Sequence, residues 1–451
     1  MTDHISYRLA LILPQSRQVV AAKIDDTCVL PEISIPLWER PSEQLTQFIE
    51  ERWHIKSTVL DIVFDDRPES PCAIIEVRSS SWKPTSAGLS QVDFDTIGEH
   101  SLGAKDRKVL GSILAGEDSG RGHFSRIGWI DDARAWVQQV THDCGSPVTG
   151  DTLHLNADGH FCLIRFATSS GAGYWLKATG EPNTREFGIT VFLSAECPKY
   201  LPRLVAVRED WNAWLTEEHG SSMHDSNSLD DFRLAIRSMA GLQKSLVGRS
   251  DTLMKACCSD QRNQTLQSRI AELFSYLNEA MALQTSTRVS KLSSLRLKEL
   301  GTLSREACLQ QEDLAIPDSL MHGDINPGNI LLSGNRCVFT DWCEAHVGNP
   351  FVTLEQMCVY VNRISTEPEQ WIHALSDEYR ASWMEVLSER QILRSLRLAP
   401  LLSILSSLHG RGDWLNSPTR SEPRRLSYSR SLARHMDRAV RTTALQEALC
   451  L

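Results

Sequence analysis

Three side chains that end in oxygen ligands are concentrated in one short part of this 451-residue chain. The segment 322–329 reads His-Gly-Asp-Ile-Asn-Pro-Gly-Asn, so Asp324 and Asn329 lie five residues apart across a Pro-Gly turn that can fold back and bring them together. Short apolar runs at 330–332 and 337–339 predict a hairpin, and this hairpin would present Asp341 beside Asp324 and Asn329. Two carboxylates and a carboxamide favour Mg²⁺. Phosphoryl transfer uses such a metal together with a carboxylate that orients the attacking hydroxyl.

The spacing H-G-D-x-x-x-x-N, followed by a strand that ends in Asp341-Trp342, resembles the aminoglycoside phosphotransferase and choline kinase branch of the protein-kinase-like superfamily. The resemblance implies that Asp324 is the catalytic base and that Asn329 and Asp341 hold Mg²⁺. It also implies that His322 braces the loop, while Gly323 is expected to allow close backbone packing. The alternative is that Asp324 and Asn329 only cap turns.

A lysine for the α- and β-phosphates is expected at Lys177, because a lysine among apolar neighbours on a short strand needs an anionic partner. Glu186 follows nine residues later, at the start of a segment with helical spacing. Lys177 and Glu186 resemble the strand lysine and helix glutamate of the superfamily. A plain surface salt bridge is the alternative.

Two further segments are assigned to the nucleotide by their position alone. The turn 156–160, which contains Asp158 and Gly159, stands where the superfamily places its phosphate-covering loop, although it lacks G-x-G-x-x-G and a simple hairpin fits as well. The segment 210–216, which contains Trp214, resembles the hinge that binds adenine through its backbone.

The hydrophobic pattern places these motifs on a small sheet and on a helical body. Apolar runs at 9–13, 59–64 and 73–77, with a helix from Ser42, predict a mixed α/β domain over residues 1–120. Extended segments at 152–155, 161–167 and 174–178 predict a small antiparallel sheet within 125–218, and helical periodicity predominates over 219–451. With the resemblance, which covers roughly residues 129–380, the expected class is α+β. It is a bilobal protein-kinase-like fold, with a sheet lobe and a mainly helical lobe, preceded by the small α/β domain.

Two regions lie outside the motif. In the N-terminal domain, the segment 50–55 faintly resembles the end of a Nudix box, but most of the metal-binding carboxylates are absent, so a non-catalytic domain is expected. Residues 411–441 contain eight arginines against Asp413, Glu422 and Asp437. A solvated helical face is one interpretation of this excess, and contact with an anionic partner or with the nucleotide is the other.

Composition limits the class of protein. Lys plus Arg is 47 and Asp plus Glu is 57, a net charge of −10 that argues against a general nucleic-acid binder. No run approaches the roughly 18 consecutive apolar residues of a membrane span, and the first residues lack the apolar core of a signal peptide. The 12 cysteines contain no C-x-x-C, which favours reduced thiols in a cytoplasmic protein.

Together these observations predict a phosphotransferase that uses Mg²⁺ and ATP, or GTP, and acts on a hydroxyl of a small molecule. The alternative is a nucleotide-binding regulatory pseudokinase without transfer activity. The acceptor, the choice between ATP and GTP and the oligomeric state stay open, because acceptor specificity is expected to reside in the helical stretch 229–314 and not in the motif. Glu344 is either part of an acidic acceptor site or a solvated carboxylate.

Overall fold

The computed structural model describes residues 4–24, 27–37, 40–64, 70–79, 81–117, 121–144, 147–157, 159–412 and 414–449. The chain forms two compact units, Met1–Phe187 with Arg203–Glu218, and Gly188–Pro202 with His219–Leu451. The predicted boundary near residue 120 falls inside the first unit, whereas the predicted boundary at 218/219 coincides with the passage from one unit to the other. The division into three domains stays a prediction. Among the helices described, none has the length and apolar character that crossing a membrane requires.

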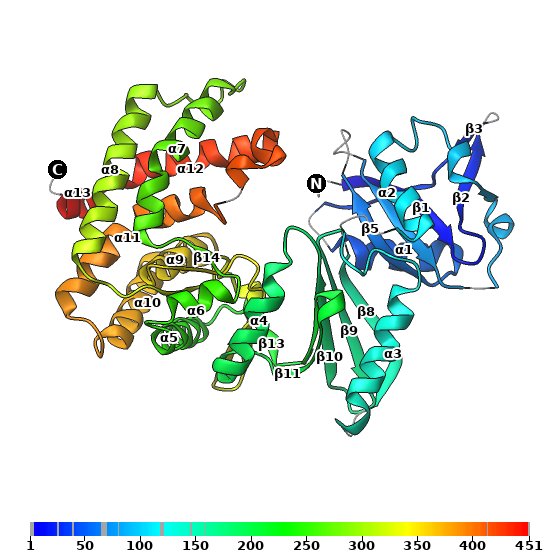
Figure 1. Cartoon of the computed structure of the whole chain (residues 1–451), viewed down its shortest axis with the longest axis horizontal. Helices are drawn as coiled ribbons and strands as arrows, with labels where there is room; N and C mark the ends of the chain where they lie inside the picture. The colour runs from blue at the N-terminus through cyan, green and yellow to red at the C-terminus, as the bar shows by residue number, and fades with distance from the viewer. Residues whose placement is uncertain are drawn as a thin grey trace. The chain divides into compact units, whose positions relative to one another are not determined.

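The first sheet of the first unit is mixed and has a helix on each face (Figure 1). Alternation along β1 directs Leu9 and Leu11 toward helix α1 (Pro41–Trp53), and Ala10 and Ile12 toward helix α2 (Ala104–Ala115). The order is β3-β2-β1-β6-β5, with β4 paired to β1 and β7 to β2. The predicted strands and helix of this region are confirmed, with bounds β1 His4–Leu13, β2 Gln18–Ile24, β3 Thr27–Val29, β4 Glu32–Pro36, β5 Ser57–Val63, β6 Cys72–Val77 and β7 Ser90–Val92.

The second sheet of the first unit is antiparallel, as predicted, and runs β11-β12-β10-β9-β8. Its strands are β8 Val148–Ala157, β9 Phe161–Thr168, β10 Gly173–Thr179, β11 Leu204–Arg208 and β12 Ala213–Glu217. Helix α3 (Trp129–Thr141) covers one face, where its Trp129 and Trp136 pack with Leu176 of β10 and Leu215 of β12. Lys177, on the other side of β10 from Leu176, therefore faces away from this core.

The second unit is mainly helical and contains two three-stranded sheets. One runs β13-β16-β17 and the other β14-β18-β15. The strands are β13 Ser221–Ser222, β14 Ser259–Asp260, β15 Ser319–Met321, β16 Ile330–Ser333, β17 Arg336–Phe339 and β18 His346–Gly348. The helices are α5 Leu229–Ser245, α6 Ser250–Lys255, α7 Asn263–Ala282, α8 Ser294–Asp313, α9 Phe351–Ile364, α10 Pro368–Trp383, α11 Glu389–His409, α12 Pro423–Ala439 and α13 Thr443–Leu449; α4 (Arg185–Glu196) begins in the first unit and continues in the second.

The helical unit has two apolar cores, and the predicted α+β class is confirmed. One core joins α5, α9 and α10 to the strands around the motif, and the other joins α7, α8, α11, α12 and α13. Helix α5 begins after Ser228, whose side chain accepts a hydrogen bond from the backbone of Asp231.

Burial raises the pKa of several thiols to about 12, so they remain protonated core side chains: Cys258, Cys308, Cys337 and Cys358.

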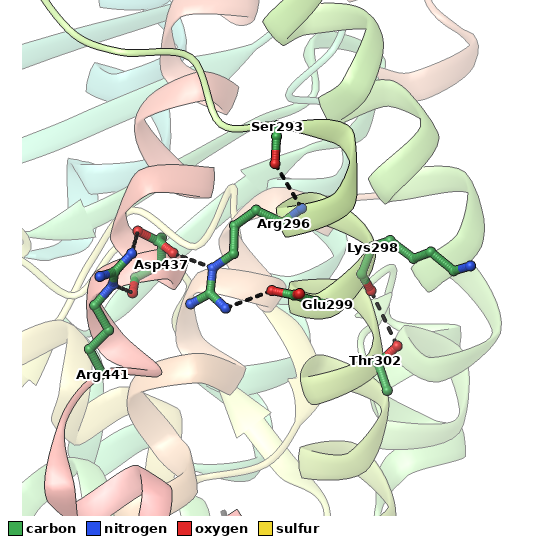
Figure 2. A network of polar contacts seen from close by, with 7 residues as sticks. All are labelled: Ser293, Arg296, Lys298, Glu299, Thr302, Asp437 and Arg441. Carbon is green, nitrogen blue, oxygen red and sulfur yellow. Dashed lines mark hydrogen bonds and ion pairs between the residues drawn. The ribbon is translucent and has the colours of Figure 1, made fainter.

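Helix α12 is fastened to helix α8 by a network of charged side chains. Figure 2 shows Arg296 of α8 between Glu299, at 3.0 Å, and Asp437 of α12, at 2.6 Å. Asp437 also pairs with Arg441 at 2.9 Å. Although burial opposes the effect, the hydrogen bonds from Arg296 and Arg441 lower the pKa of Asp437, so its carboxylate stays charged. The network holds the C-terminal arginine-rich helix in one position on the helical unit.

Candidate active site

The loop that follows β15 folds back as its sequence predicts. The Asn326 side chain accepts a hydrogen bond from the Gly328 backbone at 2.9 Å, which closes a tight turn. The turn returns Asn329 to Asp324, where the Asn329 amide nitrogen donates to the backbone carbonyl at 2.9 Å and to the carboxylate at 3.1 Å. Asp324 is exposed, while the hydrogen bonds of Asn326 and Asn329 hold the loop that carries it. The structure therefore brings the two predicted residues together.

Asp341 is tied to the same loop through its neighbour Thr340. Strands β16 and β17 form the predicted hairpin, and beyond β17 the Thr340 backbone donates to the carbonyl of Asn329 at 2.9 Å. Asp341 follows with a φ of 64°, a left-handed conformation that is uncommon outside glycine. Such conformations persist where the surrounding structure enforces them, and they are enriched at functional sites. The backbones of the two predicted metal ligands are thus directly coupled.

His322 braces the loop, as the resemblance implies. Its side chain is fully buried, and Nε2 donates a hydrogen bond to the Thr340 carbonyl at 2.9 Å. Its ring lies 4.5 Å from the ring of Trp342, measured between centroids. His322, two residues before Asp324, therefore links the start of the loop to the segment that carries Asp341.

Gly323 makes the close approach that its position predicts. Its φ is 85°, and a Cβ at this position would clash with the backbone carbonyl of Glu344. We expect Gly323→Ala to lower the free energy of unfolding by roughly 1–3 kcal/mol, because it combines a strained φ with this clash. Gly334→Ala is the matched control, since Gly334 has a φ of 56° but nothing within 4 Å of a Cβ. Denaturant unfolding of both variants compares the two effects, and equal losses would exclude the close approach as the cause.

The small sheet β14-β18-β15 organises the surroundings of Asp324. Strand β15 leads into His322, and β18 begins two residues after Glu344. His346, the first residue of β18, donates from Nδ1 to the Glu344 carbonyl at 3.0 Å. Burial lowers the pKa of His346 to about 4, so its ring is neutral at physiological pH. The backbone of Glu344 is therefore held against the loop that carries Asp324 by a hydrogen bond from a neutral ring and by close packing.

Glu344 is paired with Arg411, a member of the arginine-rich stretch 411–441. The Arg411 guanidinium lies 2.8 Å from the Glu344 carboxylate. The two residues are separated by 67 positions, and no local pattern links them. Hydrogen bonds within the helical unit are made by several arginines of 411–441, among them Arg411, Arg420, Arg430, Arg434 and Arg441.

In the first unit, Lys177 and Glu186 form the expected ion pair. Their charged atoms lie 2.7 Å apart, and the side chains are 12% and 2% exposed. Lys177 also lies over the rings of Phe161 and Trp214, at 5.5 Å and 5.9 Å from their centroids. A pair this buried differs from the solvated salt bridge that was the alternative.

Separating the structural role of Lys177 from a role toward nucleotide requires a double variant. Lys177→Met alone should lower the free energy of unfolding by roughly 1–3 kcal/mol, because Glu186 is left buried and charged. Lys177→Met with Glu186→Leu should recover most of that loss, while the affinity for Mg·ATP stays roughly tenfold or more below wild type. Calorimetry and denaturant unfolding measure the two quantities. Wild-type affinity in the double variant would exclude contact between Lys177 and the phosphates.

Three further residues are predicted to contact the nucleotide, namely Trp214, Asp158 and Gly159. Trp214 is a buried residue of β12, opposite Lys177, and the segment 210–216 consists of a turn and this strand. Its contact with adenine stays a prediction. The local alternation of Trp214 with Ala213 and Leu215 produces a strand. Asp158 lies outside the described residues. Gly159 is buried beside Arg121, which forms an ion pair with Asp61 of β5, and its contact with phosphate stays a prediction.

Comparison with known proteins finds a family that is similar to part of this chain. Residues 214–387 match the model described as the phosphotransferase enzyme family. A search of curated proteins finds no match. Similar solved structures include a choline/ethanolamine kinase family protein from Mesorhizobium loti, at 15% identity, covering 71% of this chain and 98% of that chain with a TM-score of 0.44. A GDP complex of an aminoglycoside 2'-phosphotransferase-IIIa mutant has 14% identity and covers 69% and 99%, with a TM-score of 0.46.

The family match includes every residue of the motif from His322 to Asp341. The predicted resemblance is therefore confirmed for this region, whereas the Nudix-like character of the N-terminal domain stays a prediction. The match to the phosphotransferase enzyme family is confined to residues 214–387.

Proposed function

We propose that this protein transfers the γ-phosphoryl group of ATP, or of GTP, to a hydroxyl group of a small molecule. The observation that carries the proposal is the folded-back loop, in which Asn329 is hydrogen-bonded to Asp324 and to the backbone of Thr340. The family match of residues 214–387 supports the same reaction class.

Asp324 is proposed to accept a hydrogen bond from the acceptor hydroxyl and to take its proton as the O–P bond forms. Its exposure leaves the carboxylate accessible to an acceptor, and the hydrogen bond from Asn329 keeps it in one orientation. A base fixed in this way avoids the entropic cost of ordering a side chain during the reaction.

Asn329 and Asp341 would hold Mg²⁺. The donor set fits this ion, because both offer hard oxygen atoms. The Asn329 amide nitrogen is engaged by Asp324, so its Oδ1 lies on the opposite side of the amide, as a metal ligand requires. When bound, the ion neutralises charge on the phosphates. Lys177, held by Glu186 in the first unit, is proposed to bind the α- and β-phosphates.

The test is transfer of radiolabelled γ-phosphate from ATP or GTP to a panel of aminoglycosides, macrolides, sugars, choline and hydroxylated amino acids. Transfer should require Mg²⁺ and should be lost in Asp324→Asn. Binding of Mg·ATP with no phosphorylated product from any acceptor would instead support the regulatory, non-transferring alternative.

A further inference from the structure

A buried glutamine of helix α5 contacts both ends of the strand that leads to Asp324. Strand β15 has three residues, so Ser319 and Met321 lie on the same face of it. Ser319 Oγ donates a hydrogen bond to the Gln243 backbone carbonyl at 2.6 Å, and Gln243 Nε2 lies 3.6 Å from Met321 Sδ. Strand β15 lies at the edge of its sheet, where it pairs with β18. Gln243 therefore contacts the first and last residues of an edge strand whose backbone is held by β18.

The side-chain amide of Gln243 also joins this strand to two other helices. Its Nε2 donates to Thr353 Oγ1 of α9 at 2.9 Å, and its Oε1 accepts from the Tyr379 hydroxyl of α10 at 2.6 Å. The Tyr379 hydroxyl also lies 2.8 Å from the Pro350 carbonyl, immediately before α9. The side chains of Gln243, Thr353 and Tyr379, which we call the Gln243 network, are fully buried where α5 packs with α9 and α10 (Figure 1). One amide thus connects β15, α9 and α10.

The network constrains the arrangement of these elements more than it stabilises them. Apolar side chains of similar shape, placed where a buried polar group and its partners stood, leave stability roughly unchanged or higher. A paired polar network differs from such packing, because any shift leaves a donor or an acceptor unpaired in a low dielectric. The Tyr379 ring packs against the rings of Phe351 and Trp383, at 5.5 Å and 6.2 Å between centroids, which restricts its hydroxyl. The hydrogen bonds of the network therefore define one position of β15 relative to α9 and α10.

The position of β15 determines where Asp324 lies. Met321, the last residue of the strand, is three residues before Asp324. Between them, Gly323 has no space to accommodate a shift, since even a Cβ there would clash with the Glu344 carbonyl. A displacement of β15 would therefore be transmitted to the loop that carries Asp324.

We propose that Gln243, Thr353 and Tyr379 are positioning residues for phosphoryl transfer, which hold Asp324 in place for the acceptor hydroxyl by fixing β15. This inference rests on the proposed function and extends it to residues that do not touch a substrate. A misplacement of about 1 Å, caused by a change far from the reacting atoms, can lower a rate roughly 100-fold. Because all three side chains are fully buried, their loss should lower kcat while the KM for nucleotide and for acceptor stays nearly constant.

The test replaces the network by apolar side chains of similar shape. In the triple variant Gln243→Met, Thr353→Val and Tyr379→Phe, kcat should fall roughly 10- to 100-fold, while each KM changes by less than about threefold. The midpoint of urea unfolding should stay close to that of wild type, because the polar partners are removed together. Gln311→Met with Ser395→Ala is the matched control, since it removes a buried amide and a buried hydroxyl, 3.0 Å apart, between α8 and α11. This control should leave kcat unchanged.

Two single substitutions of Thr353 separate positioning from packing. Thr353→Val keeps the shape of the side chain but removes the hydroxyl to which Gln243 donates, so kcat should fall. Thr353→Ser keeps the hydroxyl but removes a methyl group from the core, so most of kcat should be retained. If only packing mattered, Thr353→Ser would be the more damaging of the two.

Hydrogen exchange gives a readout that does not depend on transfer. In the triple variant, the backbone amides of residues 319–329 should exchange roughly tenfold or more faster than in wild type, because β15 and the loop open more often. The amides of α7 and α8, which belong to the other apolar core, should exchange at wild-type rates.

Unchanged exchange over residues 319–329, or wild-type kcat in the triple variant, would overturn the inference and leave the proposed function intact. An equal loss of kcat in the control with Gln311→Met and Ser395→Ala would also overturn it, because the effect would then be general. Absence of transfer by the wild type with every acceptor would refute the proposed function. The exchange measurement would then still decide whether the Gln243 network fixes the loop.

Discussion

Asp324→Asn lowers the rate constant of phosphoryl transfer by roughly 10²–10⁴-fold, the contribution typical of a positioned general base. The substitution keeps the shape of the side chain and removes its ability to accept a proton. The backbone hydrogen bond from Asn329 to the Asp324 carbonyl does not depend on the side chain, so the loop should keep its conformation. The expected change is therefore in kcat, with a small effect on the KM for nucleotide.

The measurement is single-turnover transfer with the best acceptor from the panel. Asp251→Asn is the control, because Asp251 is an exposed acidic residue at the start of α6. Thermal unfolding midpoints of the two variants should agree with wild type within experimental error. A rate for Asp324→Asn within threefold of wild type would remove Asp324 from the proposed chemistry.

Arg8→Met lowers the free energy of unfolding by roughly 3–5 kcal/mol, because it leaves a buried carboxylate without its cation. Arg8 lies in β1 and is 1% exposed. Its guanidinium contacts Asp106 of α2 at 2.5 Å, the Ser101 carbonyl at 2.8 Å and the Ser70 carbonyl at 2.7 and 2.9 Å. One guanidinium thus donates hydrogen bonds to acceptors on Ser70, Ser101 and Asp106, and its loss leaves all three acceptors without this donor.

Urea denaturation followed by tryptophan fluorescence measures the loss. Arg8→Met combined with Asp106→Leu should recover part of the stability, since no charge is then left buried. Arg203→Met is the exposed counterpart, because Arg203 pairs with Glu217 at the surface and its side chain is 63% exposed. It should cost roughly 1 kcal/mol or less. If Arg8→Met cost no more than Arg203→Met, the buried pair would not stabilise the N-terminal fold.

The parts of the site that were predictable from sequence are those built by short-range geometry. The turn that returns Asn329 to Asp324 closes through hydrogen bonds between residues at most five positions apart, so its local sequence predicts it. The hairpin that precedes Asp341 is likewise local. The pairing of Lys177 with Glu186 was predictable because both the strand and the helix have clear periodicity and lie close in the chain.

The parts that could not be predicted depend on packing between distant segments. Arg411 contacts Glu344 from the turn after α11, to which Gln261 is hydrogen-bonded, and neither contact has a sequence pattern. The polar residues around Trp211 obscure the alternation of β12, so the strand within 210–216 is not apparent from the sequence. Asp61 and Arg121 meet at Gly159 through the docking of the first sheet, which lies outside any motif.

The hydrogen bond from Gln261 to the Gly410 carbonyl has a consequence for evolution of the chain. The small sheet is complete once residue 348 has been synthesised, so the loop with Asp324 can be assembled before the segment with Arg411 leaves the ribosome. The turn that carries Arg411 is therefore added to a sheet that is already complete, and exchange of the segment after α11 would leave the strands of that sheet unchanged.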